Sequence, residues 1–190
     1  MKTAFENDIR QCVAALQQGG VILYPTDTIW GLGCDAADEA AIEKISKLKH
    51  RPVQKSFVVL LADARQIFQF VAAPPPDIIE LLAGFEEPTT VVYPDGLNLA
   101  PGVLAADGSV AIRVTKDAFC KALIKRFGGP VVSTSANISG ELPPRFFQDI
   151  NPEIIDGADY VVRFRQEEVA EKKASRILRL LPDGSFERLR

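Results

Sequence analysis

One stretch, residues 21–36 (VILYPTDTIWGLGCDA), constrains the fold of this chain more than any other. Its first four residues are apolar and β-favouring, and the run is short enough to be a buried strand. Pro25 lacks a backbone N–H, so we expect the strand to end there. Small polar residues follow at 26–28, and Gly31 and Gly33 then allow backbone to approach a ligand. A strand followed by a glycine-rich turn explains the same residues equally well.

Bulk properties favour one domain, 1–190, in a cytoplasmic protein. A chain of 190 residues can bury roughly 70% of its unfolded surface without disulfides. The net charge of −3 provides no overall field for nucleic acid or an anionic membrane. Cys12, Cys34 and Cys120 lack metal-ligand or redox spacing, which predicts reduced thiols. There is neither an apolar run near the ~18 residues of a membrane span nor a signal-peptide core, so we expect no membrane association.

Apolar periodicity and chain breakers predict helices that interleave with strands. Thr3 and Glu6 have capping-box spacing, and Asp38 can cap a second helix. Consecutive strands occur near the C-terminus, so the class is α/β (α+β), with one twisted mixed sheet flanked by helices. The first predicted helix begins near Thr3, and the other predicted helices span 38–48, 64–70, 77–82 and 116–127. The predicted strands span 21–24, 56–62, 89–93, 109–114, 131–133, 160–164, 176–181 and 186–189.

Several standard catalytic and nucleotide-binding motifs are missing from the sequence. There is no G-x-x-x-x-G-K-[ST] phosphate loop and no G-x-S-x-G nucleophile motif. Residues 31–36 formally fit a dinucleotide fingerprint, but six residues separate them from the apolar run. His50 is the single histidine and lies among cations, which favours a solvated residue near a helix end over a triad or zinc site.

Cations and hydroxyls remain as candidates for a binding site. Lys49, Arg51 and Lys55 form a basic cluster after the second helix, and Arg113 lies inside a strand, where an unpaired guanidinium would be costly to bury. Such groups at strand ends suit an anionic ligand that carries phosphate and carboxylate. The further candidates are Ser133, Ser135, Asn137, Ser175 and Arg190.

Each group also has a structural explanation. The basic cluster alone fits a solvated helix end favoured by the helix dipole. Arg113 fits an internal ion pair equally well. The run from Ser133 to Asn137 fits a cap between a strand and a helix.

Five motifs in register resemble the YrdC-like family, the threonylcarbamoyl-AMP synthases of tRNA modification. The resemblance runs from about residue 20 to residue 190 and fits the short, single-domain form of the family. The motifs are Pro25-Thr26-Asp27-Thr28, Gly31-Leu32-Gly33-Cys34-Asp35-Ala36, Lys49-x-Arg51-Pro52, Val110-Ala111-Ile112-Arg113 and Thr134-Ser135-Ala136-Asn137-x-Ser139-Gly140.

The resemblance implies a YrdC-like fold, with an electropositive cavity on one face of the sheet, and a nucleotidyltransferase activity. L-Threonine, bicarbonate and ATP would give L-threonylcarbamoyladenylate and pyrophosphate, with Mg²⁺ accompanying ATP. Other proteins would then transfer the threonylcarbamoyl group to adenosine 37 of tRNA. Every reactant is anionic or zwitterionic, so alignment and charge neutralisation are the main tasks of such a site.

The resemblance also assigns residues. Thr28, Arg113, Ser133 and Ser175 match positions that hold threonine. Lys49 and Arg51 are the cations that we expect to matter most to the reaction rate. Both lie beyond the last apolar contact of their helix, so we expect neither to fill the core. The positions that match the ATP side are Arg51, Lys55, Ser135, Asn137 and Arg190, and no protein side chain is identified as a metal ligand.

Three departures from the family pattern leave alternatives open. Residues 86–90 (EEPTT) stand where the family has Pro-Gly-Pro-Leu-Thr, Arg176 stands where it has threonine, and residues 55–57 (KSF) replace Asn-Pro-Leu. A paralogue with the same nucleotide pocket and another acyl substrate is one alternative. A module for double-stranded RNA or tRNA is another, although the net charge favours at most weak tRNA binding.

Overall fold

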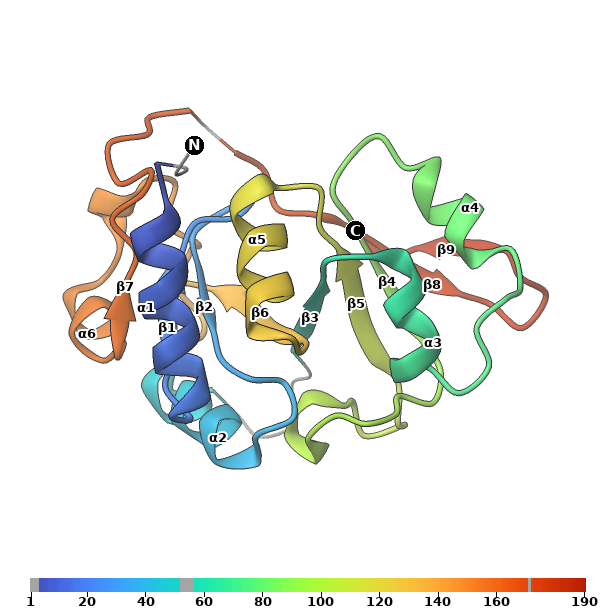
Figure 1. Cartoon of the computed structure of the whole chain (residues 1–190). Coiled ribbons are helices and arrows are strands. Elements are labelled where there is room, and N and C mark those ends of the chain that lie inside the picture. Colours follow the sequence, from blue (N-terminus) through green and yellow to red (C-terminus); the bar gives the residue numbers. More distant parts are fainter. Residues whose placement is uncertain (1–3, 52–56, 171) are drawn as a thin grey trace.

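The computed structural model describes residues 4–51, 57–170 and 172–190. The strands in these ranges form one mixed sheet in the order β7-β1-β2-β6-β3-β5-β4-β8-β9 (Figure 1). The strands are β1 (Ile22–Tyr24), β2 (Gly31–Gly33), β3 (Val58–Leu61), β4 (Thr89–Tyr93), β5 (Val110–Val114), β6 (Val131–Ser135), β7 (Tyr160–Val161), β8 (Arg176–Leu180) and β9 (Phe186–Arg188). The helices are α1 (Glu6–Gln17), α2 (Glu39–Leu48), α3 (Ile67–Phe70), α4 (Ile78–Ala83), α5 (Ala118–Phe127) and α6 (Pro152–Asp156).

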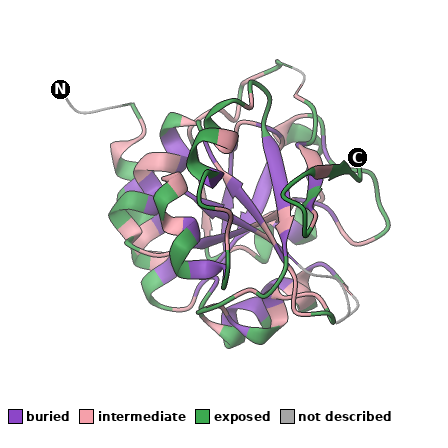
Figure 2. Ribbon diagram, turned by 90° about the vertical axis from the view of Figure 1, so that its right-hand side faces the viewer, coloured by how far each residue is buried: buried purple, intermediate pink, exposed green. Residues whose placement is uncertain are grey.

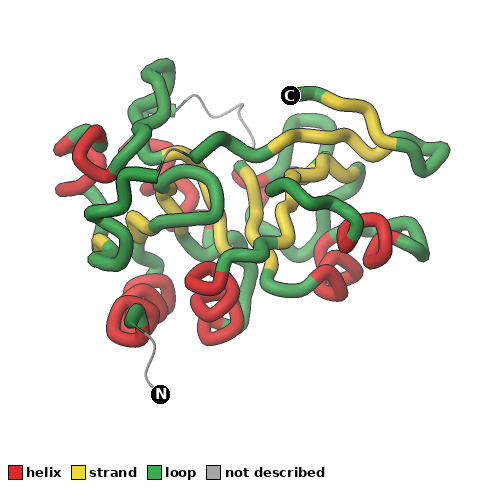
Figure 3. Tube along the Cα trace, turned by 90° about the horizontal axis from the view of Figure 1, so that it is seen from above, coloured by secondary structure: helices red, strands yellow, loops and turns green. Residues whose placement is uncertain are grey.

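The sheet mixes parallel and antiparallel neighbours, as the sequence predicted. β3 pairs parallel with β5, and β4 pairs parallel with β8, whereas β1–β2, β2–β6, β3–β6, β4–β5 and β8–β9 are antiparallel. α1 and α5 lie side by side over one face (Figure 1), and the view from above shows a row of helices along one side of the strands (Figure 3). Buried residues concentrate in the central strands (Figure 2). The expected class, a twisted mixed sheet flanked by helices, is confirmed.

The start of α1 differs from the expected capping box. Thr3 lies outside the described residues, and the helix begins at Glu6 after Phe5, whose side chain makes no capping hydrogen bond. The ring of Phe5 instead packs on Phe119 and Phe164, at centroid distances of 5.5 and 5.0 Å. Aromatic packing therefore holds the start of this helix. The second predicted cap is confirmed, because the Asp38 carboxylate accepts hydrogen bonds from the first turn of α2.

Gly31 and Gly33 form a strand, and this corrects the expectation of glycines in a loop beside a ligand. A Cβ on Gly33 would lie 2.6 Å from a ring carbon of Tyr24 and 2.7 Å from the carbonyl oxygen of Val132. Contacts below 3.0 Å do not occur for real side chains, so only glycine lets these strands pack closely here. The glycine motif therefore serves the packing of the sheet.

Two predicted strands end more than one residue away from their predicted ends. β6 continues to Ser135 because Thr134 and Ser135 pair with Leu32 and Gly31 of β2. β7 ends at Val161, three residues before the predicted end at 164, because the backbone N–H of Phe164 donates to the buried carboxylate of Asp8 on α1. A side chain from a distant helix thus ends β7, and local sequence carries no sign of that contact.

All three cysteines are buried and unpaired. Cys12 lies on α1, Cys34 follows β2, and Cys120 lies on α5, where its thiol approaches the carbonyl oxygen of Pro25 at 3.5 Å. Burial raises the pKa of each thiol. Among the described residues, no helix is both long and apolar enough to cross a membrane.

Candidate functional site

The loop between β1 and β2 carries the first group of candidate residues, and Thr26 fixes its shape. The hydroxyl of Thr26 accepts a hydrogen bond from the backbone N–H of Thr28 at 3.0 Å and donates to the carbonyl of Ile29 at 2.8 Å. The hydroxyls of Thr26 and Thr28 lie 2.9 Å apart, and both side chains are buried. The intervening residue, Asp27, is therefore held in a defined position at the turn.

Asp27 faces Arg113 of β5 across this turn. Arg113 Nη2 lies 3.3 Å from Asp27 Oδ1, and the two side chains are 6% and 16% exposed. Neither Asp27 Oδ1 nor Arg113 Nε has a hydrogen-bond partner among the residues that the structure describes, although both atoms are buried. The ion pair that the structural explanation of Arg113 required is thus present, but it leaves charged groups with unused hydrogen-bonding capacity.

Ser175 lies at the adjoining part of the sheet. β4 lies between β5, which carries Arg113, and β8, which follows Ser175. The hydroxyls of Thr90 and Ser175 lie 2.8 Å apart in a buried contact, and Arg190 donates to the Ser175 carbonyl at 3.0 Å. The structure therefore gathers Thr28, Arg113 and Ser175 with their neighbours around one end of β5.

Lys49 is buried, which corrects the expectation that it lies outside the core. It is 1% exposed, and its ammonium donates to the backbone carbonyls of Ser135 and Asn137. Its own carbonyl accepts from the N–H of Ser139 at 2.8 Å. Burial, and then the charge of Arg51, lowers the pKa of Lys49 to about 8. Lys49 thus joins the end of α2 to the end of β6 and the segment that follows it, and it differs from a solvated helix end.

In the segment after β6, the side-chain amide of Asn137 also donates hydrogen bonds to backbone carbonyls. Asn137 Nδ2 donates to the carbonyls of Ile138 and Glu141, each at 2.9 Å, while Oδ1 is buried and has no partner within the described part of the chain. No helix begins within residues 136–146, so the alternative of a cap between a strand and a helix is wrong. Ser133 and Ser135 are half-buried on β6.

Arg51 and Lys55 complete the basic cluster of the sequence. The guanidinium of Arg51 lies 4.4 Å from the ring centroid of Phe57, and burial lowers its pKa. Lys55 lies outside the described residues. His50 is exposed, with its imidazole 2.8 Å from Glu153, which confirms a solvated residue near the helix end.

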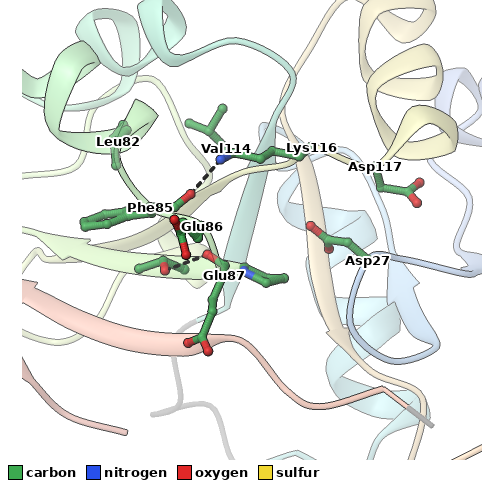
Figure 4. Close-up of a pocket in the computed structure, with 10 residues that line it drawn as sticks. Asp27, Leu82, Phe85, Glu86, Glu87, Val114, Lys116 and Asp117 are labelled. Carbon is green, nitrogen blue, oxygen red and sulfur yellow. Dashed lines mark hydrogen bonds between the residues drawn. The ribbon is translucent and has the colours of Figure 1, made fainter.

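Two cavities adjoin Asp27. The first, of about 270 Å³, lies between the segment around Phe85 and the turn that precedes α5 (Figure 4). The second, of about 450 Å³, lies in front of Ser175, and Asp27 and Glu87 line both. Its cations outnumber its carboxylates, so the second cavity is electropositive. These cations are Lys172, Lys173, Arg176, Arg188 and Arg190.

The sequence interpretation included Asp27 among the small polar residues after the first strand but gave it no role, and it missed most of the cations of the second cavity. One signal was available for Asp27, because it stands between two threonines at the end of a buried strand. The cations had a weaker signal, since they are scattered along the last 19 residues and only the sheet order brings the C-terminal strands beside β4.

Two of the departures from the family pattern contact each other. Arg176 donates to the Thr89 hydroxyl at 3.1 Å, and its guanidinium lies 5.0 Å from the ring centroid of Phe85. Lys116 donates to the Phe85 carbonyl at 2.6 Å (Figure 4). The changed segment and the added arginine therefore form one structural unit that shapes the first cavity. Among the described residues, no group of three or more His, Cys, Asp or Glu side chains could hold a metal ion.

Known proteins share both the sequence and the fold. Residues 14–190 match the model of the Sua5/YciO/YrdC family, described as "Telomere recombination". The chain is 36% identical over 153 residues to a threonylcarbamoyl-AMP synthase of Stenotrophomonas maltophilia, covering 79% of this chain and 82% of the relative. It is 41% identical over 133 residues to the enzyme of that name from Saccharophagus degradans, covering 70% of each chain.

Solved structures of other proteins share the fold of this chain. P. abyssi Sua5 complexed with L-threonine superposes with a TM-score of 0.80 and 25% identity over 96% of this chain, which spans about half (53%) of that protein. E. coli YciO has a TM-score of 0.79 and 21% identity, with coverage of 96% and 90%, and shares the fold. The matched model, the relatives and the common fold together show that this chain belongs to the Sua5/YciO/YrdC family.

Proposed function

We propose that this protein is an L-threonylcarbamoyladenylate synthase and acts as a nucleotidyltransferase. It forms threonylcarbamoyl-AMP and pyrophosphate from L-threonine, bicarbonate and ATP. The observation that carries this proposal is the Asp27–Arg113 pair, which lies beside an electropositive cavity of about 450 Å³. A site with both signs of charge next to an excess of cations suits a zwitterionic amino acid beside a polyphosphate. Relatives that carry the name threonylcarbamoyl-AMP synthase support the same activity.

The chemistry needs no covalent nucleophile from the protein. The amine of threonine forms a carbamate with bicarbonate, and water is lost. A carbamate oxygen then attacks the α-phosphorus of ATP, the bond to the bridging oxygen breaks, and pyrophosphate leaves. The protein must align the two reactants and neutralise charge at the leaving group.

The residues divide between the two substrates in this proposal. Thr28, Arg113, Ser133 and Ser175 hold threonine, and Arg113 suits a grip on its carboxylate. Lys49 acts by holding the carbonyls of Ser135 and Asn137, as its two hydrogen bonds suggest. The groups on the ATP side are Arg51, Lys55, Ser135, Asn137 and Arg190.

Mg²⁺ enters this proposal as the MgATP complex. The described residues offer no carboxylate cluster for it, so phosphate oxygens and water would be its ligands. When bound, the ion neutralises charge on the departing pyrophosphate.

The product is activated for transfer, so other proteins would consume it when tRNA is modified. We propose a cytoplasmic location for these steps, together with weak direct binding of tRNA. A module that only binds RNA is the second candidate, and the row of cations in the second cavity is the observation that favours it. Filter binding at two salt concentrations, measured beside turnover, separates these functions.

Turnover with labelled bicarbonate tests the proposal. We expect label to enter an adenylate-containing product only when L-threonine, bicarbonate and MgATP are all present. Pyrophosphate release, measured with each of the twenty amino acids in turn, should be fastest with threonine. Equal release without an amino acid, or no labelled adenylate, would contradict the proposed function. A different preferred amino acid would instead identify a paralogue.

A further inference from the structure

We propose that Asp27 is the residue that binds the α-amino group of the substrate amino acid. This inference rests on the proposed function and names a contact that the sequence interpretation did not assign. It starts from the pair of Asp27 and Arg113, which are 3.3 Å apart but lack hydrogen-bond geometry.

The position of Asp27 suits this role. Arg113 lies against Oδ1, while Oδ2 has one long contact, 3.4 Å from the Thr115 hydroxyl. The side chain keeps 16% of its surface exposed and lines both cavities. In Figure 4 its carboxylate points toward the side of the pocket on which Glu86 and Glu87 lie. Asp27 therefore presents a partly satisfied carboxylate where a ligand can enter.

Asp117, whose carboxylate also lines the first cavity, has a structural role and serves as a comparison. Asp117 accepts the N–H of Cys120 at 2.9 Å on Oδ1 and the guanidinium of Arg165 at 2.7 Å on Oδ2. Both of its oxygens are used, and it caps α5. Among the described residues, Asp27 has no comparable short partner on either oxygen. A buried charge with unused hydrogen-bonding capacity is costly unless a ligand completes it.

Charge complementarity identifies the ligand group. A free amino acid carries an ammonium and a carboxylate two bonds apart, and Asp27 with Arg113 offers the opposite charges side by side. The carboxylate of Asp27 accepts hydrogen bonds from the amine, and Arg113 keeps donors for the amino acid's carboxylate. The amine is thereby held facing the cavity in which it must meet bicarbonate.

Deletion analogues of the ligand, crossed with variants of the protein, test this inference. The probes are L-threonine, (3R)-3-hydroxybutanoate, which lacks the amine, and L-threoninol, which lacks the carboxylate. Calorimetry measures the affinity of each for the wild type, Asp27→Asn and Glu87→Gln. Glu87 is the matched control, because it lines both cavities and is exposed, and it has no ion pair among the described residues.

We expect the wild type to bind threonine at least about 10-fold more tightly than 3-hydroxybutanoate, the range for a charge-assisted hydrogen bond. Asp27→Asn should reduce this ratio toward one while keeping the preference for threonine over threoninol. Glu87→Gln should keep both ratios. A wild-type ratio near one, or an unchanged ratio in folded Asp27→Asn, would overturn the inference alone.

Two other outcomes, an unfolded variant and a wild type that does not bind threonine, also have defined consequences. If Asp27→Asn fails to fold in thermal melts, Asp27→Glu replaces it, since it keeps the charge but displaces the carboxylate by one methylene. Its amine discrimination should also fall, and a wild-type ratio there would overturn the inference. If the wild type binds no threonine at all, the proposed function is overturned together with the inference.

Discussion

Lys49 and Arg113 are both buried cations, 1% and 5% exposed, yet their surroundings differ in kind. Lys49 is bound by two neutral backbone carbonyls, which fill two of its three donor positions. Arg113 faces a carboxylate, and its Nε has no partner among the described residues. One cation holds two segments of the chain together, and the other holds a charged group beside a cavity.

The difference shows that burial alone does not identify a catalytic cation. A neutral partner leaves the ammonium charge uncompensated, so burial lowers the pKa of Lys49. A carboxylate partner compensates the charge of Arg113 and leaves hydrogen-bonding capacity for a ligand. The partner of a buried cation therefore indicates whether it serves the fold or a substrate.

Arg51→Ala is the strongest way to test this division. Lys49 is enclosed, so we expect Arg51, and not Lys49, at the phosphates. Removal of a preorganised donor should slow adenylate formation on the order of 100-fold. Arg51→Lys should restore only part of the rate, because lysine lacks the planar fork. Single-turnover formation of threonylcarbamoyl-AMP measures this, and a wild-type rate would exclude Arg51 from the phosphate site.

Arg113→Ala tests the other half of the comparison. We expect threonine binding to weaken roughly 30-fold or more and ATP binding to change little, because a charge-assisted pair is lost on the amino-acid side alone. Calorimetry with each ligand on the folded variant gives both affinities. Equal losses for the two ligands would mean that Arg113 only supports the sheet.

Lys49→Ala should mainly reduce stability. The carbonyls of Ser135 and Asn137 would lose their buried donor, which costs about 2 kcal/mol in the free energy of unfolding. For a domain of this size, this is roughly 4–8 °C in melting temperature. Lys47→Ala on the same helix is the control, since its side chain is 76% exposed. An unchanged melting temperature for Lys49→Ala would contradict the structural role and restore the solvated helix end.

The pH dependence of stability should carry the signature of the same lysine. The pKa of Lys49 is about 8 in the folded protein and 10.5 when unperturbed, so the unfolded chain binds more protons between these values. The free energy of unfolding of the wild type, relative to Lys49→Met, should therefore rise as the pH increases from about 8 to 10.5. Urea unfolding at several pH values measures this difference, and a flat difference would show an unperturbed ammonium.

Thr90→Val is expected to have the smallest effect. The contact of its hydroxyl with Ser175 is buried and neutral, so its loss should cost about 1 kcal/mol of stability. A double-mutant cycle with Ser175→Ala isolates the coupling between the two side chains. A coupling near zero would detach Ser175 from the Arg113 end of the sheet.

The sequence predicted the sheet well because its strands are short apolar runs with clear breakers. β4 was predicted with its observed ends, and Asp38 was identified as the cap of α2. The end of β7 was missed because Asp8, about 150 residues away, determines it. The burial of Lys49 was missed for the same reason, since its partners lie at the end of β6 and just after it. Local patterns do not contain contacts between distant segments.

The buried thiols of Cys12, Cys34 and Cys120 can be used to detect local opening of the structure. They lie on α1, directly after β2 and on α5, respectively. A buried thiol reacts only after its surroundings open and its proton is lost. Cys120 lies against Pro25, at the base of the loop that carries Asp27. Its alkylation rate would therefore follow motions of that loop, while Cys12 and Cys34 report on other parts of the sheet. Threonine should slow the labelling of Cys120 alone.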